Sequence, residues 1–228
     1  MPEYYLCRGT GRCFILNSLG RSNGYPVKRN SQTKGKAVMK ISIIFHSVCA
    51  NNYLIAKIFY KNLKTKDQNV SLYRVADSDW TKQENTPSIA KENLKNMMNL
   101  SIATPAVMLE SDLVVMGSPT YFGNVSAEIK AYMDSAAKYW IKAELAGKKL
   151  VAFTSVGNPQ GGGDLCLQAI QTFGMYMGMT CVPVPTTLIP NENIHPFGIV
   201  HYSYSKYGEE LDNKTQTAIE KFSKQILR

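Results

Sequence analysis

The chain has 228 residues, of which 44% are hydrophobic and 19% are charged, a composition that supplies a packed core and excludes a wholly disordered chain. No run approaches the roughly 18 consecutive apolar residues of a membrane helix, so we expect no membrane association. The 5 cysteines are an odd number without close spacing, which argues against a disulfide framework and favours a reducing, cytoplasmic compartment.

The net charge of +9 is concentrated at the N-terminus. Residues 1–38 carry 7 Lys/Arg and 1 Glu, and their apolar runs are too short for a signal peptide. A solvated tail explains this charge more simply than nucleic-acid binding, so we expect no nucleic-acid partner. An Arg-rich transit peptide and a natural start at Met39 stay open. We predict a basic extension over 1–38, poorly ordered or a leader, and one folded domain over 39–228.

Apolar runs typical of strands alternate with helical patterns along the rest of the chain. In the first helical pattern, Leu54, Ile55, Ile58 and Phe59 share one stripe. The predicted strands cover residues 41–45, 70–75, 113–116, 150–154 and 180–184. Further helices are predicted over 94–100, 125–139, 164–177 and 213–227, with a polar, aromatic loop over 190–208.

This alternation predicts βαβ units and an α/β domain with a doubly wound parallel sheet flanked by helices. Five strands suit the flavodoxin-like order 2-1-3-4-5, which binds its ligand at the carboxyl edge, between strands 1 and 3. Three loops leave strands 1, 3 and 4 at that edge, and they cover residues 46–52, 119–124 and 155–163.

Each of these loops has features of a ligand site. Residues 46–52 offer neutral donors at the start of a helix, where free N–H groups and the helix dipole favour a phosphate. Residues 117–124 combine Pro, Gly and aromatic side chains with little charge, which suits a planar heteroaromatic ring, and Asn124 is expected to cap the next helix. Four glycines within 157–163 permit close backbone approach to a flat ligand. Alone, each loop is also typical of an ordinary turn, and their meeting at one edge is the stronger signal.

From Met39 onward, the chain resembles flavodoxin-like FMN proteins and, within them, the WrbA family of NAD(P)H:quinone oxidoreductases. The resemblance implies FMN as cofactor, NADH or NADPH as electron donor, a quinone or similar aromatic molecule as acceptor, and a homodimer or homotetramer. It spans roughly residues 39–226. The residues that carry it are 117–124, 133–140, 153–155, the glycine loop, 178–179, 182–184 and 195–198.

The resemblance also implies residue roles. Trp140 matches an aromatic residue that covers the open face of the flavin ring. Two positions depart from the family pattern: the phosphate loop lacks its usual glycine, and Met177 replaces a histidine beside the flavin. The implied FMN contacts are Ser47, Cys49, Ala50, Asn51 and Asn52 at the phosphate, Pro119, Thr120, Tyr121, Phe122, Gly123 and Asn124 at the ring and ribityl chain, and Ser155, Val156, Gly157, Asn158 and Gly161 at the pyrimidine edge.

No side chain is required as an acid or base, because a flavin carries the redox chemistry itself. We expect no metal, since His195 and His201 have no third ligand nearby in the sequence. Cys49 lies at a helix N-terminus, which is expected to lower the pKa of its thiol. Two other functions stay open: a flavodoxin-type electron carrier without NAD(P)H oxidase activity, and a flavin-free scaffold or nucleic-acid-binding protein.

Overall fold

The computed structural model describes residues 38–65, 67–78 and 88–228, which belong to one compact unit. All of the predicted basic extension except Val38 therefore lies outside the described residues, and the boundary at residue 38 stays a prediction. Among the helices that are described, none is long and apolar enough to cross a membrane.

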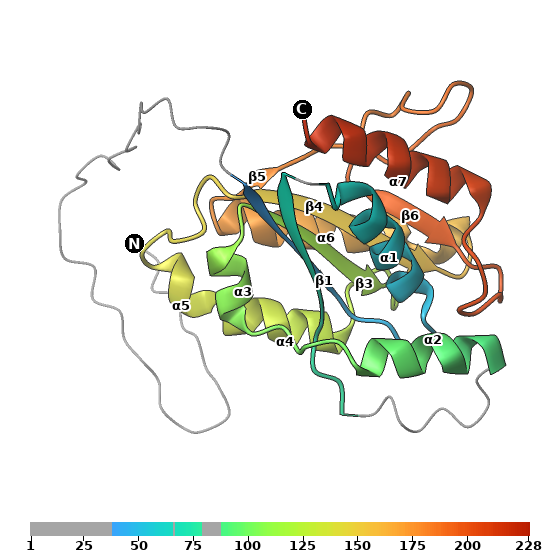
Figure 1. Cartoon of the computed structure of the whole chain (residues 1–228), viewed down its shortest axis with the longest axis horizontal. Coiled ribbons are helices and arrows are strands. Elements are labelled where there is room, and N and C mark those ends of the chain that lie inside the picture. Colours follow the sequence, from blue (N-terminus) through green and yellow to red (C-terminus); the bar gives the residue numbers. More distant parts are fainter. Residues whose placement is uncertain (1–37, 66, 79–87) are drawn as a thin grey trace. The chain divides into compact units, whose positions relative to one another are not determined.

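Strands and helices alternate along the chain, as predicted (Figure 1). The short helix α3 was not predicted, and neither was β6, which lies within the predicted loop 190–208. The strands are β1 Met39–Phe45, β2 Gln68–Arg74, β3 Leu113–Pro119, β4 Lys149–Val156, β5 Thr180–Cys181 and β6 Ile199–Tyr202. The helices are α1 Asn51–Leu63, α2 Ser88–Met98, α3 Pro105–Glu110, α4 Ala127–Ser135, α5 Ala137–Trp140, the 3-10 turn η2 Pro159–Gly161, α6 Gly163–Tyr176 and α7 Asn213–Ile226.

The sheet has the order β2-β1-β3-β4-β5 with parallel pairing throughout, which confirms the predicted flavodoxin-like topology. Its fifth strand is shorter than predicted. β5 pairs only with the start of β4, because the next N–H on that side of the strand, that of Val184, donates to the carbonyl of Pro196 at 3.0 Å instead of to β4. β6 takes the same edge further along, where Ile199 lies opposite Phe153 and Tyr202 lies opposite Val156. The loop prediction is therefore wrong for these residues.

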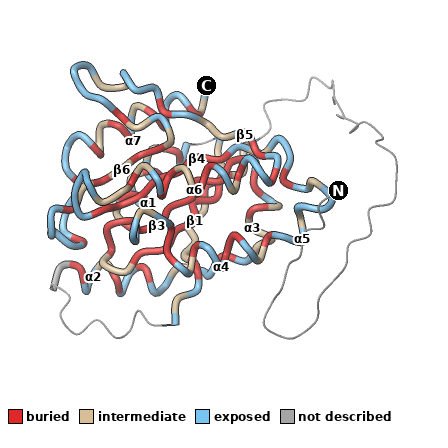
Figure 2. Tube along the Cα trace, turned by 180° about the vertical axis from the view of Figure 1, so that it is seen from behind, coloured by how far each residue is buried: buried red, intermediate tan, exposed pale blue. Residues whose placement is uncertain are grey.

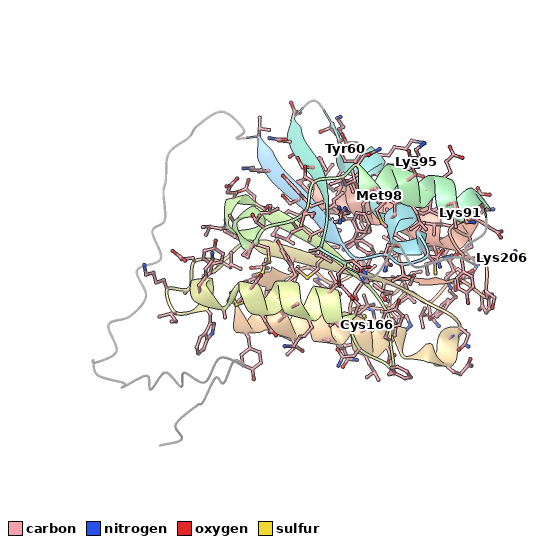
Figure 3. The ribbon with its side chains drawn as sticks, turned by 90° about the horizontal axis from the view of Figure 1, so that it is seen from below. Tyr60, Lys91, Lys95, Met98, Cys166 and Lys206 are labelled. Carbon is pink, nitrogen blue, oxygen red and sulfur yellow. The ribbon has the colours of Figure 1, made fainter. Side chains whose placement is uncertain are left out.

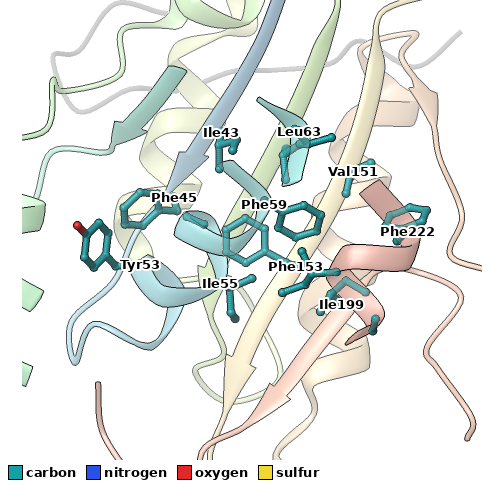
Figure 4. Packing of buried hydrophobic residues seen from close by; sticks show 14 of the residues in the cluster. Ile43, Phe45, Tyr53, Ile55, Phe59, Leu63, Val151, Phe153, Ile199 and Phe222 are labelled. Atoms are coloured by element: carbon teal, nitrogen blue, oxygen red, sulfur yellow. The ribbon is translucent and has the colours of Figure 1, made fainter. Parts of the chain in front are cut away.

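Side chains of the central strands alternate between two hydrophobic cores, as expected for a sheet covered on both faces. On β1, Ile43 and Phe45 face the core that includes α1 and α7, whereas Ile44 faces the core that includes α4 and α6. In the first core, the rings of Phe59 and Phe153 lie 5.7 Å apart between centroids (Figure 4). Figure 2 shows burial concentrated along these strands. The residue after Phe45 consequently points to the α4 side.

Gly117 marks a close approach between β3 and β4. A Cβ at this position would lie 2.1 Å from the ring of Phe153, so no larger residue fits without displacing that ring. The carbonyl of Gly117 also accepts the N–H of His46 at 3.1 Å, just beyond the end of β1. The first residue of the 117–124 stretch thus has a structural role in positioning both neighbouring strands.

Candidate functional site

A pocket of about 160 Å³ lies at the carboxyl edge of the sheet, where β1, β3 and β4 end. Each of the three loops predicted to form a site contributes to its lining, so the structure brings them together. No charged side chain lies among these lining residues. The residues that line the pocket are Ser47, Val48, Cys49, Asn51, Pro119, Thr120, Tyr121, Ser155, Val156, Gly157, Ser203 and Tyr207.

The lining differs from the predicted site in two ways. Some lining residues were not predicted, and some predicted residues do not line the pocket. Val48, Ser203 and Tyr207 are lining residues that were not predicted. Residues predicted at the site but outside the lining are Ala50, Asn52, Phe122, Gly123, Asn124, Asn158, Gly161 and Trp140.

The loop between β1 and α1 presents main-chain donors to this pocket. Ala50 precedes α1 with φ 64° and ψ −4°, the left-handed conformation that glycine adopts most readily. No side chain caps α1 and its first turn carries no acidic residue, so the first N–H groups are available to an anion. Asn52 is fully buried, and its Nδ2 donates to the carbonyl of His46 at 3.0 Å, which holds the loop in place.

The loop after β3 closes in a two-residue reverse turn. Tyr121 and Asn124 exchange both backbone hydrogen bonds at 3.0 Å, and the central residues have positive φ, 51° at Phe122 and 72° at Gly123. These angles are those of a type I′ turn, which requires glycine or a strained residue at each central position. The turn carries the side chain of Phe122 fully into solvent. Ser126, not Asn124 as predicted, caps α4 by accepting the N–H of Ile129 at 3.3 Å.

The glycine loop after β4 packs against the loop after β3. Thr120 donates its N–H to the carbonyl of Ser155 at 2.9 Å. Gly162 has φ 76°, and a Cβ on it would lie 2.8 Å from Cα of Gly123. A Cβ on Gly161 would lie 2.4 Å from Val156. Glycine is therefore needed at these two positions for close approach within the protein, whereas Gly157 lines the pocket and has open space around it.

A fourth segment, residues 203–208, completes the wall of the pocket. Its backbone extends β6, because the N–H groups of Ser203 and Tyr204 donate to the carbonyls of Val156 and Gly157, each at 2.9 Å. At its other end, Gly208 donates its N–H to Oδ1 of Asn51 at 2.7 Å. The segment thus connects the glycine loop to the start of α1. In the sequence, the run of β-branched and aromatic residues at 199–202 indicated the strand that this segment continues.

Burial raises the pKa of two side chains that line the pocket, Cys49 and Tyr121. Burial raises the pKa of the Cys49 thiol, which contradicts the predicted lowering at the start of α1. Burial also raises the pKa of Tyr121 to about 12, and negative charge on Cys49, Glu128 and Asp77 adds to this shift. Both groups are therefore neutral near pH 7, in keeping with the uncharged lining.

Other candidate residues lie apart from the pocket. Trp140 is half-exposed on α5, and Met177 is buried in the core beside α4 and α6. Cys166 of α6, labelled in Figure 3, is buried with its Sγ 3.6 Å from Oγ1 of Thr154.

The two histidines weighed as metal ligands do not share a site. Nε2 of His195 lies 3.3 Å from the hydroxyl of Tyr202, whereas Nδ1 of His201 lies 3.0 Å from Oδ2 of Asp212. A different histidine, His46, lies close to two carboxylates at the end of β1.

Curated relatives share much of the chain. An NAD(P)H dehydrogenase (quinone) of Archaeoglobus fulgidus is 28% identical over 180 residues, which cover 78% of this chain and 91% of the relative. An NAD(P)H dehydrogenase (quinone) of Deinococcus radiodurans is 27% identical over 147 residues, with 64% and 74% covered.

Among solved structures, the flavodoxin, WrbA-like protein from Agrobacterium tumefaciens has a similar fold. It superposes with a TM-score of 0.54 at 15% identity, covering 82% of this chain and 94% of that one. The family model for NADPH-dependent FMN reductase matches residues 39–193. These findings confirm the predicted flavodoxin-like oxidoreductase with FMN and NAD(P)H as cofactors, and the chain belongs to the NADPH-dependent FMN reductase family.

Proposed function

We propose that this chain binds FMN in the pocket at the carboxyl edge and passes electrons from NADH or NADPH to a quinone or a similar aromatic acceptor. The observation that carries the proposal is the meeting of three loops in one uncharged pocket beside the uncapped start of α1. The curated relatives named NAD(P)H dehydrogenase (quinone) support the choice of acceptor.

The residues of the pocket and of the start of α1 fit FMN. The free N–H groups at the start of α1 suit a phosphate, and the hydroxyl of Ser47 with the amide Nδ2 of Asn51 adds neutral donors. The absence of acidic residues from the first turn of α1 and from the described lining removes repulsion toward a dianion. At about 160 Å³, the pocket is smaller than the ~300 Å³ at which sites for whole ligands begin, so part of the cofactor would lie outside it.

FMN, when bound, supplies the hydride and electron transfer, and the protein supplies placement and electrostatics. The main chain around Gly157 would donate to the ring edge at which negative charge develops on reduction. Tyr121, whose pKa is raised to about 12, would stay neutral beside the ring. Phe122, Asn158 and Gly161 are proposed contacts of the parts of the cofactor outside the pocket.

A comparison of FMN with riboflavin tests the proposal directly. The purified full-length chain should show a bound-flavin absorbance spectrum, or acquire one on addition of FMN. Riboflavin lacks the phosphate and should bind at least tenfold more weakly, a difference of about 1.4 kcal/mol. Equal affinity for the two ligands would place the phosphate elsewhere, and a chain that binds neither would overturn the proposal.

A flavodoxin-type electron carrier is the second candidate, because solved flavodoxins share this fold. One from the domain Archaea superposes with a TM-score of 0.50, covers 83% of this chain and all of that one, and is 16% identical. The distinguishing experiment is anaerobic addition of NADH or NADPH to the FMN-loaded protein. Bleaching of the flavin without a partner reductase supports the enzyme, whereas a flavin that stays oxidised supports the carrier.

We further propose a homodimer or homotetramer in the cytoplasm. Large apolar side chains are exposed on α5 and at the end of α6, including Trp140, Met175 and Tyr176, and such surface is typical of subunit contacts. Trp140 would then cover a flavin from a neighbouring subunit. Light scattering after size exclusion should give a mass of two or four chains, and Trp140→Ala should lower it. A monomer would contradict this proposal, and subcellular fractionation tests the compartment.

The basic extension is proposed to be dispensable for the flavin site. A chain that begins at Met39 should bind FMN with the affinity of the full chain, and the intact mass of the native protein shows whether 1–38 is retained. Loss of FMN binding on truncation would assign the extension to the folded domain.

A further inference from the structure

Three titratable side chains meet at the end of β1, on the side of the sheet that faces α4. The side chain of His46 is 3% exposed, that of Asp77 is 9% exposed and that of Glu128 is 29% exposed. Nε2 of His46 lies 3.0 Å from Oδ2 of Asp77 in hydrogen-bond geometry. Nδ1 of the same ring lies 3.4 Å from Oε2 of Glu128, but it is buried and has no hydrogen-bond partner.

This geometry leaves the second ring nitrogen unsatisfied. A neutral imidazole carries one N–H, and if Nε2 donates it to Asp77, Nδ1 presents only a lone pair. That lone pair then faces a carboxylate oxygen of Glu128, which is also an acceptor. Two acceptors side by side, one of them buried, repel each other unless a cation lies between them. Either a second proton or a metal ion meets that requirement.

We propose that His46 and Glu128 bind a divalent transition-metal ion, with Zn²⁺ as the best fit. Zinc bonds of about 2.1 Å to nitrogen and oxygen place two ligands of a tetrahedral site about 3.4 Å apart, which is the separation observed here. A histidine that binds a metal through one nitrogen usually donates the other N–H to a carboxylate, which orients the ring. Asp77 occupies that position. Imidazole with carboxylate favours zinc over magnesium or calcium, which prefer oxygen ligands alone.

The exposed side of Glu128 leaves room for the remaining ligands. Water can reach the partly exposed Glu128, and it would complete the coordination on that side. On the Asp77 side, a cavity of about 10 Å³, close to the volume of one water, is lined by His46, Asp77 and Arg74. Arg74 contributes the one positive charge among the residues lining this cavity. With neutral His46, the side chains of His46, Asp77, Glu128 and Arg74 together carry a net charge of −1. A bound divalent cation would make the net charge of this group positive.

The group is distinct from the pocket but adjacent to it. Ser47 lines both the pocket and the small cavity. One nitrogen or oxygen atom from each of His46, Asp77 and Glu128 lies within 4.8 Å of the other two, and the group joins the end of β1, the segment after β2 and the first turn of α4. A bound ion would therefore hold three separate elements together and raise the melting temperature.

The test is a titration of the full-length protein, stripped with a chelator, with Zn²⁺ followed by calorimetry and by the melting temperature. We expect one site per chain that His46→Gln and Glu128→Gln both abolish, along with the rise in melting temperature. Asp77→Asn should weaken binding about 10- to 100-fold, as other residues that orient a metal-binding histidine do. His201→Gln is the matched control, because its ring already pairs with Asp212, and it should bind zinc as the parent does.

Cysteine-bound zinc is excluded by Co²⁺ substitution, since binding at His46 and Glu128 produces no thiolate-to-metal charge-transfer band. Glu128 is partly exposed, so its substitution keeps the test valid even if the His46 variant fails to fold. The proposal is overturned if the parent binds no zinc, if Glu128→Gln binds it equally well, or if the bound cobalt shows thiolate ligation. The first of these results would assign the space between Nδ1 and Glu128 to a proton.

Discussion

The two sides of the segment that links β1 to α1 differ in the charge of their side chains. On the pocket side, no lining residue is charged, and the polar groups are main-chain N–H groups, hydroxyls and an amide. On the α4 side, one histidine lies within hydrogen-bonding or ion-pairing distance of two carboxylates. Successive side chains at the end of a strand point to opposite faces, so adjacent residues serve both environments. The comparison shows that the backbone of this one segment positions both the neutral pocket and the charged group.

The largest effect should come from the residue that supports both sides. Gly117→Ala places a Cβ 2.1 Å from the ring of Phe153, and such overpacking costs about 1–3 kcal/mol. Because the carbonyl of Gly117 accepts the N–H of His46, the variant should also weaken both FMN and Zn²⁺ binding. Urea unfolding measures the stability, and titrations with FMN and with Zn²⁺ measure the two affinities.

A second-site change checks the cause. Phe153→Leu removes the ring that the new methyl group would strike, so the double variant Gly117→Ala with Phe153→Leu should lose less stability than the two single changes added together. Strict additivity would mean that the contact with this ring is not what makes glycine necessary at 117.

A change confined to the pocket side should separate the two regions. Asn51→Ala removes the acceptor of the Gly208 N–H, and an unpaired buried donor costs about 1–3 kcal/mol. FMN affinity should fall roughly tenfold as the 203–208 segment loosens, a change of about 1.4 kcal/mol. Zinc binding should not change. Asn93→Ala is the control, because Asn93 bonds the carbonyl of Gly208 from outside the pocket and should affect FMN binding less.

Cys49 provides a test through pH. Because burial raises the pKa of its thiol, alkylation near pH 7 should be slow and should accelerate only above the usual thiol value of about 8.5. Mass spectrometry of iodoacetamide-treated protein follows the rate, with the fully buried Cys166 as an internal reference. Rapid labelling of Cys49 at pH 7 would instead indicate a thiolate stabilised by the start of α1.

The smallest effect is expected at Ala50. Its φ of 64° is unfavourable for any residue with a Cβ, so Ala50→Gly should raise the free energy of unfolding, by about 0.5–1 kcal/mol at most, without loss of FMN affinity. Ala56→Gly within α1 is the matched control and should destabilise by about 1 kcal/mol. A destabilised Ala50→Gly would show that the methyl group contributes packing that outweighs the backbone strain.

Much of the architecture was predictable because the signal is local. Apolar runs and helical stripes identified the strands and helices, and the rules for parallel sheets determined that the loops at 46–52, 119–124 and 155–163 would share one edge. β6 was missed because its four residues lie in a segment rich in aromatic and polar residues, and its place in the sheet depends on β4. The role of Ser203 and Tyr207 in the pocket was missed for the same reason.

Within the loops, the residue types were easier to predict than their orientations. Phe122 was expected at the ring; the positive φ angles of its turn place its side chain in solvent, outside the pocket lining, and its contact with the cofactor stays a proposal. Glycines 161 and 162 were expected to allow close approach to a ligand, and the structure shows that close packing against Val156 and Gly123 already requires glycine at these positions. A glycine-rich composition permits close approach but does not specify the partner, which for Gly162 is Gly123 of another loop.

The sequence by itself determined the alternating elements, the strand order and the edge at which a ligand would bind, since these follow from hydrophobic periodicity and from the handedness of βαβ units. Only the tertiary structure decided that Asp77 and Glu128 meet His46, and that residues 203–208 close the pocket. The contacts of His46 with Asp77 and with Glu128 span 31 and 82 positions of the chain, and the contact of Gly208 with Asn51 spans more than 150. Side-chain chemistry over such separations is set by how the elements pack, and no local pattern encodes it.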